Sequence, residues 1–128
     1  MNLLIDTHIF LWFVNDNSQL SDHLKDLIED KNNQIYLSLA SLWEMSIKYN
    51  LGKLKFDTSY EEFIDVEISQ SCLNLLNIEV KHFNINATLP LYHRDPFDRL
   101  IIAQSISENM PIISMDYFFS PYPITLIN

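Results

Sequence analysis

Near the N-terminus a short apolar run stops at a carboxylate, because Leu3, Leu4 and Ile5 are followed directly by Asp6. Three consecutive large apolar residues predict a strand that is buried on both faces, as in a parallel sheet covered by helices. Ligands of open α/β sheets bind outside the carboxyl ends of the strands, and Asp6 comes at such an end. A carboxylate beside a buried strand is also costly unless it has a partner. This stretch therefore predicts both a sheet and a functional group at its edge.

Strand-like and helix-like patterns alternate along the rest of the chain. Such alternation is typical of a parallel α/β sheet with right-handed crossovers. After the first strand, we predict strands over residues 34–37, 75–78 and 111–115, with a candidate fifth strand over residues 124–127. Helices are predicted over residues 7–14, 22–31, 40–49, 59–72, 86–91 and 96–108. We expect one α/β domain over residues 1–128, with a parallel sheet of four or five strands flanked by helices.

Helix-end signals support several of these boundaries. Ser21 and Thr58 are suitable N-caps for the second and fourth predicted helices. The last helix has the clearest start, because Asp95 is a good N-cap and Pro96 suits the first helical position. Gly52 is the only glycine of the chain and gives a natural stop signal after the third helix.

The composition limits the classes of site that the chain can contain. A single glycine excludes a glycine-rich phosphate loop and with it the nucleotide-binding fingerprints that depend on one. A single cysteine excludes an internal disulfide and fits a reducing compartment. The sequence shows neither a leader pattern nor an apolar run long enough to span a membrane. We therefore expect a soluble cytoplasmic protein with no membrane partner.

The chain is strongly acidic, with 17 Asp and Glu residues against 8 Lys and Arg residues and a formal net charge of −9. This balance argues against a nucleic-acid-binding protein that relies on a broad basic surface. It does not exclude a nuclease, because metal ions can supply the positive charge at the site. It also favours a basic protein partner.

Four acidic residues occupy informative places in the predicted topology. Asp6 ends the first strand, Asp116 ends the fourth, and Glu44 lies in the first turns of the helix after the second strand. Carboxyl ends of parallel strands and the first turns of the helices that follow them share one edge, so these three acids point to the same rim. Asp98 lies in a helix that precedes its strand, so it reaches this rim only if that helix runs across it.

Converging carboxylates cannot all stay ionised unless something positive joins them. Oxygen-only ligand sets suit the hard cations Mg²⁺ and Mn²⁺. Such ions activate water, orient phosphates and stabilise in-line displacement at phosphorus. A glycine-poor chain with clustered acids and no nucleophile motif therefore points to metal-assisted hydrolysis of phosphodiesters.

Local structural roles are the alternative interpretation of these acids. Ser41 and Glu44 have the spacing of a capping box, and Asp98 follows the cap Asp95 by three residues. Acidic residues in first helical turns are favoured by the helix dipole in any case. Asp116 can equally be a turn residue. His8, next to the first strand, is interpreted as a packed histidine.

Four sequence blocks together resemble the PIN domain, and especially the VapC-like toxins of bacterial toxin–antitoxin pairs. They are residues 4–12 (LIDTHIFLW), 41–48 (SLWEMSIK), 93–104 (HRDPFDRLIIAQ) and 114–116 (SMD). The blocks fall in the order and spacing of that family and span nearly the whole chain. One departure is Met115, which stands directly before Asp116 where the family often has threonine or serine; Ser114 is one position earlier.

The resemblance implies a three-layer PIN-like sandwich and a ribonuclease that depends on Mg²⁺ or Mn²⁺. It implies that the helix carrying Asp98 reaches the rim and that the acidic quartet, both catalytic and metal-binding, is Asp6, Glu44, Asp98 and Asp116. Asp95 is then only the helix cap. Asp6, Glu44 and Asp98 are expected to hold one or two ions, while Asp116 completes the site or binds a second ion.

Substrate and partner contacts follow as hypotheses. The Thr7 hydroxyl is expected to order water or an RNA phosphate. Arg99 is expected either to reach a phosphate or to pair with a neighbouring acid. Lys48, Lys53 and Lys55 form the only local basic cluster, which is a candidate track for the RNA backbone or else a solvated loop. The expected protein partners are a small DNA-binding antitoxin with a basic segment and a second copy of the chain.

Two rival functions remain at this point. Haloacid-dehalogenase-like phosphatases also have an aspartate after the first strand, but they require a second acid two residues later, where this chain has His8. The other rival is a catalytically inactive PIN fold that acts as a protein-binding module, against which the complete quartet argues.

Overall fold

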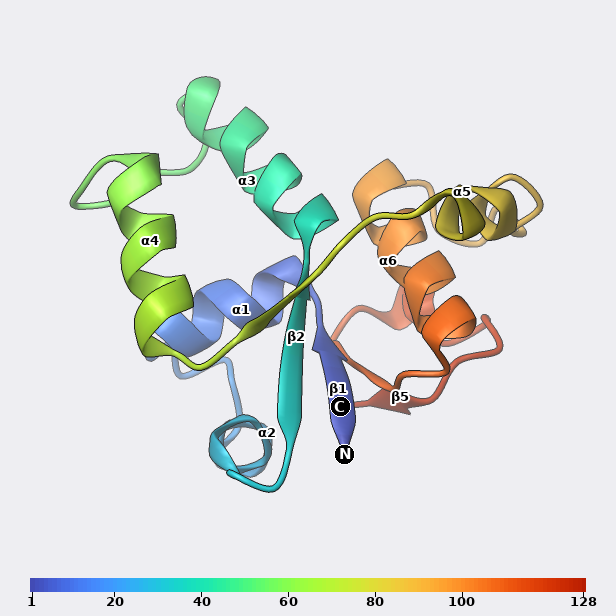
Figure 1. Cartoon of the computed structure of the whole chain (residues 1–128), viewed down its shortest axis with the longest axis horizontal. Helices are drawn as coiled ribbons and strands as arrows, with labels where there is room; N and C mark the ends of the chain where they lie inside the picture. The colour runs from blue at the N-terminus through green and yellow to red at the C-terminus, as the bar shows by residue number, and fades with distance from the viewer.

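The computed structural model describes all 128 residues and is built around a sheet of five parallel strands (Figure 1). Their spatial order is β3-β2-β1-β4-β5, so the N-terminal strand is the middle one. This confirms the predicted parallel α/β architecture and the candidate fifth strand. The strands are β1 (Asn2–Ile5), β2 (Gln34–Ser38), β3 (Asn74–Leu76), β4 (Ile112–Ile113) and β5 (Leu126–Ile127).

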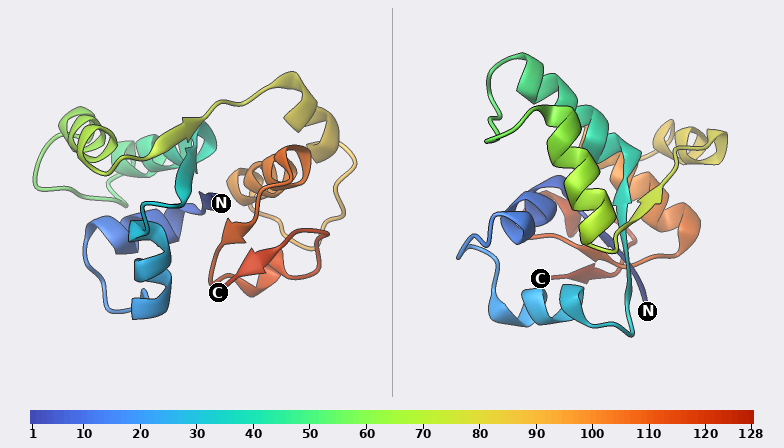
Figure 2. Two further views of the ribbon diagram at one scale, coloured as in Figure 1. Left: turned by 60° about the horizontal axis from the view of Figure 1, so that its bottom comes forward. Right: turned by 60° about the vertical axis from the view of Figure 1, so that its left-hand side comes forward.

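Six α-helices and one 3₁₀-helix cover the sheet. Figures 1 and 2 show α1, α2 and α4 on one side of the strands and α5 and α6 on the other. None of the helices has the length and apolar character needed to cross a membrane. The helices are α1 (Thr7–Val14), α2 (Asp22–Glu29), α3 (Leu39–Asn50), α4 (Tyr60–Gln70), α5 (Val80–Asn86), α6 (Pro96–Glu108) and the 3₁₀-helix η1 (Tyr117–Phe119).

The central strand β1 contributes to a core on each side of the sheet. Leu3 and Ile5 pack with apolar residues of α1, α2 and α4, whereas Leu4 packs with α6 and η1. All three side chains are fully buried. The structure therefore confirms the strand buried on both faces and the three-layer sandwich.

The carboxyl ends of β1 and β2 lead directly into helices. Asp6 is the N-cap of α1 and Ser38 is the N-cap of α3, so the chain turns into each helix with no intervening loop. Figure 1 shows α1 and α3 starting from the same end of β1 and β2. This end of the sheet is the rim at which the sequence places its acids.

Helix α6 begins beside α3, as the light-orange turn next to α3 in Figure 1 shows. Trp43 of α3 and Phe97 of α6 pack edge to face, with ring centroids 4.9 Å apart. The Asp95 carboxylate accepts hydrogen bonds from the main-chain N–H groups of Phe97 and Asp98, which confirms it as the helix cap. Asn109 ends the helix in the left-handed conformation, with φ 50°.

Several predicted boundaries are wrong, and local chemistry explains them. The helix expected over residues 86–91 is instead α5, which ends at Asn86. It begins after the cap Glu79, because His82 takes the capping-box position usually held by Glu or Gln. The N-cap of α4 is Ser59 and not Thr58, since the Ser59 hydroxyl accepts the N–H of Glu62 at 3.2 Å.

Candidate active site

Asp6 lies at the end of β1 and is 3% exposed. One carboxylate oxygen, Oδ1, accepts the main-chain N–H of Ile9 at 2.8 Å, and Oδ2 accepts the hydroxyl of Ser114 at 2.5 Å. Burial raises the pKa of Asp6 above its ordinary value, although these two hydrogen bonds act in the opposite direction. Ser114 lies just beyond β4, the neighbour of β1, so the sheet itself brings this partner to Asp6.

Glu44 lies in α3 and is also 3% exposed. Its Oε1 accepts the hydroxyl of Thr7 at 2.8 Å, and its Oε2 lies 2.6 Å from the ammonium of Lys48. The capping-box interpretation is wrong, because the cap of α3 is Ser38 and Ser41 already lies inside the helix. Glu44 therefore comes one turn deeper than a cap partner and is aimed into the protein.

Asp98 lies in the first turn of α6 and reaches the same rim as Asp6 and Glu44. The predicted order of strands and helices alone did not decide this position. Its carboxylate forms no ion pair with a lysine or arginine. Burial raises the pKa of Asp98 to about 8. The negative charges that add to this rise belong to Asp95, Glu44, Asp6 and Asp116.

Asp116 performs the predicted turn function and also faces the other acids. Its Oδ1 accepts the main-chain N–H of Phe118 and so caps η1. Its Oδ2 lies 2.9 Å from Nε2 of His93. The main-chain N–H of Asp116 donates to the Ser114 hydroxyl at 3.1 Å, which links this turn to the partner of Asp6.

His93 is the residue that sequence reasoning missed. It is 7% exposed, and its Nε2 lies 2.9 Å from Asp116 and 3.2 Å from Asp98. Its other ring nitrogen, Nδ1, accepts the main-chain N–H of Asp95 at 3.2 Å. The only signal was its place two residues before the helix cap, inside a block already matched to a family.

The donor set is suited to a hard divalent cation. Nε2 of His93 and carboxylate oxygens of Asp98 and Asp116 all lie within 4.8 Å of one another. Carboxylate oxygens are the ligands preferred by Mg²⁺ and Mn²⁺. Burial and, after it, the neighbouring carboxylates raise the pKa of Asp98, so a cation bound here would favour its ionised form. Asp6 and Asp116 also border a hollow of about 230 Å³.

His8 and Trp12 line the mouth of this hollow with Met115. The His8 side chain is exposed, and its ring lies 6.1 Å from that of Trp12. The interpretation of His8 as a packed histidine is therefore wrong. The first turn of α1 points it outward, because its neighbours Thr7 and Ile9 occupy the buried face.

The predicted substrate-binding residues have different surroundings. Thr7 is buried and its hydroxyl lies within hydrogen-bonding distance of Glu44 and Ser41. Lys48 reaches the site through its contact with Glu44, whereas the exposed Lys53 follows α3. Lys55 borders a separate hollow, which is lined by residues of the α1 and α4 ends.

The Arg99 guanidinium is occupied by main-chain carbonyl groups. Its two terminal nitrogens donate to the carbonyl oxygens of Leu89, Pro90 and His93 at 2.9–3.1 Å. The predicted ion pair with a neighbouring acid is absent. Arg99 therefore holds the loop that carries His93, and its predicted contact with an RNA phosphate stays a prediction.

A family model of the PIN domain matches residues 3–123. The chain belongs to the PIN domain family. Because the chain has a PIN domain, it does not have the rival fold of the haloacid-dehalogenase-like phosphatases. Enzymes of the PIN family are nucleases. A comparison with curated protein sequences gives no match.

Solved structures with the same PIN fold come from toxin–antitoxin complexes. The VapBC2 complex of Rickettsia felis, bound to a DNA fragment from its promoter, matches with a TM-score of 0.76 at 22% identity, covering 100% of this chain and 98% of the other. The DNA-bound VapBC complex of Salmonella typhimurium gives 0.74 at 15% identity, with 99% and 97% covered. A toxin–antitoxin complex of Klebsiella pneumoniae gives 0.67 at 18% identity, with 98% and 96% covered. These likenesses support the three-layer fold over the whole chain.

Proposed function

We propose that this PIN domain is an endoribonuclease that depends on Mg²⁺ or Mn²⁺ and serves as the toxin of a toxin–antitoxin pair. The observation that carries the nuclease proposal is the convergence of four carboxylates, from four separate segments, on one rim of the sheet. Burial and mutual repulsion raise the pKa of Asp98 to about 8, so the cluster requires added positive charge to be fully ionised.

The predicted quartet fits a hard divalent cation. Asp6, Glu44 and Asp98 would hold one or two ions, with Asp116 completing the site or binding a second ion. When bound, Mg²⁺ or Mn²⁺ would supply an activated water and neutralise the charge that develops on the scissile phosphate. PIN nucleases as a family use divalent metals, in agreement with this donor chemistry.

The chain's own residues orient these carboxylates for hydrolysis. Ser114 and the N–H of Ile9 direct the two oxygens of Asp6, and Thr7 directs one oxygen of Glu44. Pre-oriented ligands lose little freedom when a cation and substrate arrive. The proposed reaction is in-line attack of water on an RNA phosphodiester, with the 3′ oxygen as the leaving group.

RNA contacts are proposed along one side of the site. Lys48 lies beside Glu44, and Lys53 and Lys55 continue from the end of α3. Ammonium groups along such a path would contact the RNA backbone without reading its sequence. Because the chain carries a net charge of −9, nonspecific RNA affinity is expected to be modest.

An antitoxin partner is proposed from charge and fold together. Toxin–antitoxin complexes share the fold over nearly the whole chain, and two of them were solved with DNA bound. A net charge of −9 favours a basic antitoxin segment that places a cation among the carboxylates. We propose a small DNA-binding antitoxin and also a homodimer, for which the exposed Trp43 offers apolar surface.

The nuclease proposal is tested by incubating purified protein with RNA in Mg²⁺, in Mn²⁺ and in EDTA. We expect cleavage only with a divalent ion, and strong loss of cleavage in Asp6→Asn and in Asp98→Asn. The inactive binding module predicts instead that the wild type and Asp6→Asn behave alike, with no metal-dependent products. Metal-dependent cleavage that persists in the double variant Asp6→Asn, Asp98→Asn contradicts the quartet.

A further inference from the structure

The hydrogen bonds of His93 determine which ring nitrogen carries the proton. Nδ1 accepts the main-chain N–H of Asp95, so Nδ1 must present a lone pair. The ring proton is therefore on Nε2, which faces Asp98 at 3.2 Å and Asp116 at 2.9 Å. His93 thus donates a hydrogen bond to Asp116 and has the Asp98 carboxylate beside the same ring nitrogen, and in this tautomer it has no lone pair to offer a metal ion.

The loop that carries His93 is held at several points. The main-chain N–H of His93 donates to the hydroxyl of Tyr122 at 2.8 Å, and that hydroxyl donates to the carbonyl of Pro90. Arg99 donates to the carbonyls of Leu89, Pro90 and His93 itself. Because the loop is anchored to α6 and to Tyr122, the imidazole is fixed before any ligand arrives.

We propose that His93 is a positioning residue of the nuclease site: its Nε2–H donates to Asp116 and faces Asp98 at 3.2 Å, so that the two carboxylates lie side by side with their remaining lone pairs arranged for a divalent ion. This inference rests on the proposed metal-dependent function. In this inference His93 orients the metal ligands and is not itself a ligand. Groups that orient metal ligands in this way typically change metal affinity about 10–100-fold when they are removed.

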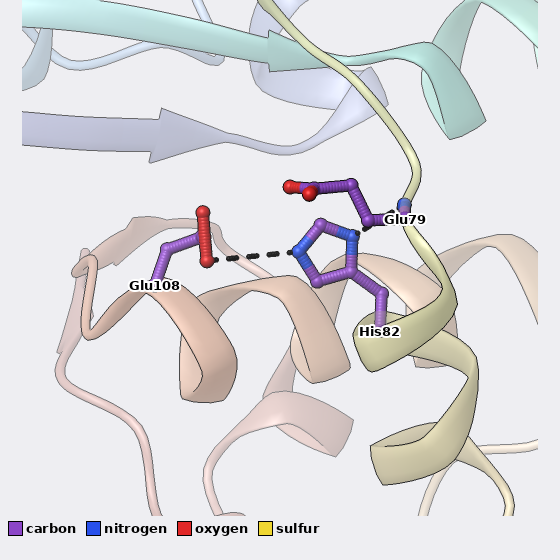
Figure 3. Close-up of side chains that lie close together, drawn as sticks. All are labelled: Glu79, His82 and Glu108. Atoms are coloured by element: carbon purple, nitrogen blue, oxygen red, sulfur yellow. Dashed lines mark hydrogen bonds and ion pairs between the residues drawn. The ribbon is translucent and has the colours of Figure 1, made fainter.

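The same tautomer argument removes His82 as a ligand in a second cluster of acidic and histidine side chains. Glu79, His82 and Glu108 gather between α5 and α6 and offer atoms within 4.8 Å of one another (Figure 3). Nδ1 of His82 accepts the N–H of Glu79, so Nε2 carries the proton and cannot ligate a metal ion. His82 is therefore a matched control, since it has the same local arrangement without the paired aspartates.

Two conservative substitutions separate the proposed role from a local structural one. His93→Asn keeps a side-chain oxygen that can accept the N–H of Asp95 in an Asx turn, but it is too short to reach the two aspartates. His93→Gln keeps an amide donor at about the reach of Nε2 but loses the turn. His93→Ala removes both functions.

The experiment is calorimetric titration of Mn²⁺ into the full chain, with the Nε2–H tautomer of His93 read in the metal-free protein from imidazole ¹H–¹⁵N correlation spectra. We expect His93→Ala and His93→Asn to weaken Mn²⁺ binding by about tenfold or more and His93→Gln to stay within about threefold of wild type. His82→Ala, if folded, or His82→Gln should bind Mn²⁺ as the wild type does.

Four results would overturn the inference. Unchanged affinity in all three His93 variants, or loss in His93→Gln with full affinity in His93→Asn, contradicts positioning while leaving the nuclease proposal intact. A proton on Nδ1 contradicts the donor assignment directly. Absence of Mn²⁺ binding in the wild type removes the proposed metal-dependent function, and the inference with it.

Discussion

Two histidines of this chain have the same local arrangement but different neighbours. In each, Nδ1 accepts a main-chain N–H near a helix start, and Nε2 faces carboxylates: Glu108 for His82, and Asp98 with Asp116 for His93. The Nε2 of His82 is buried without a hydrogen-bond partner, because Glu108 lies 3.7 Å away and is paired with Lys81. His93 instead meets two acids that no lysine or arginine neutralises.

The charge balance separates the two clusters further. The hydrogen bond from Lys81 lowers the pKa of Glu108, whereas burial raises the pKa of Asp98 to about 8. In the first cluster the charge of Glu108 is thus paired with Lys81, which joins α5 to α6. The second holds excess negative charge at the rim of the sheet. The comparison teaches that the hydrogen bond at the helix start has a structural role in both clusters, and that carboxylates without a lysine or arginine partner distinguish the candidate site.

The largest expected difference between the clusters is in RNA cleavage. Asp98→Asn removes a proposed ligand and should lower the cleavage rate in Mn²⁺ by more than about 100-fold. Glu108→Gln, the matched change in the other cluster, should cleave at the wild-type rate. Initial rates on a labelled RNA would check both, and equal losses in the two variants would show that the clusters do not differ in function.

Next in size is the effect of His82 on stability. His82→Ala removes a fully buried side chain and its capping hydrogen bond, so the free energy of unfolding should fall by about 2–3 kcal/mol. Urea denaturation followed by circular dichroism measures this loss. Mn²⁺ affinity of the folded fraction should be unchanged, and a parallel loss of affinity would contradict the purely structural role of this cluster.

A smaller effect is expected in the pH dependence of the metal-free protein. The pKa of Asp98 is about 8 when folded and 3.8 in the reference state, so the folded protein binds this proton more tightly. That contribution to stability is fully present below the lower pKa and is lost as the pH rises through the higher one. In EDTA, Asp98→Asn should therefore melt a few degrees above wild type at pH 8.5 and show a weaker decline from pH 5 to 8.5. Identical dependence of the melting temperature on pH in wild type and Asp98→Asn would contradict the raised pKa of Asp98.

The smallest effect on stability should come from the ion pair between Lys81 and Glu108. Lys81 is half exposed, so Glu108→Gln should cost less than about 1 kcal/mol near neutral pH. Because the pKa of Glu108 is lowered, its contribution is present above its ordinary pKa and disappears as the pH falls below it. The dependence therefore runs opposite to that of Asp98, which thermal melts of the two variants at pH 3.5 and 7 would compare.

Short-range sequence patterns predicted much of the fold but only part of the candidate site. The apolar run before Asp6, the Asp95-Pro96 start and the alternation of strands with helices are short-range signals, and each was confirmed. The rim position of Asp98 depends on α6 packing beside α3 through Phe97, which is a long-range contact. His93 was missed for the same reason, since it meets Asp116 across 23 residues of sequence.

The errors in the helix boundaries have a related origin. Helix α5 begins with a capping box in which His82 replaces the usual Glu or Gln, so its start was not recognised. The strand expected over residues 111–115 is shorter, because β4 comprises only Ile112 and Ile113. Ser114 follows directly, where its main-chain N–H still donates to the carbonyl of Ile127 in β5 and its hydroxyl donates to Asp6.

The most direct test of the central claim is a calorimetric titration of Mn²⁺ into wild type, Asp98→Asn and Glu108→Gln under identical conditions. The account predicts that wild type and Glu108→Gln bind Mn²⁺ with the same affinity and that Asp98→Asn loses most of it. Undiminished binding in Asp98→Asn, or loss of binding in Glu108→Gln, would contradict the placement of the metal centre among the four converging carboxylates.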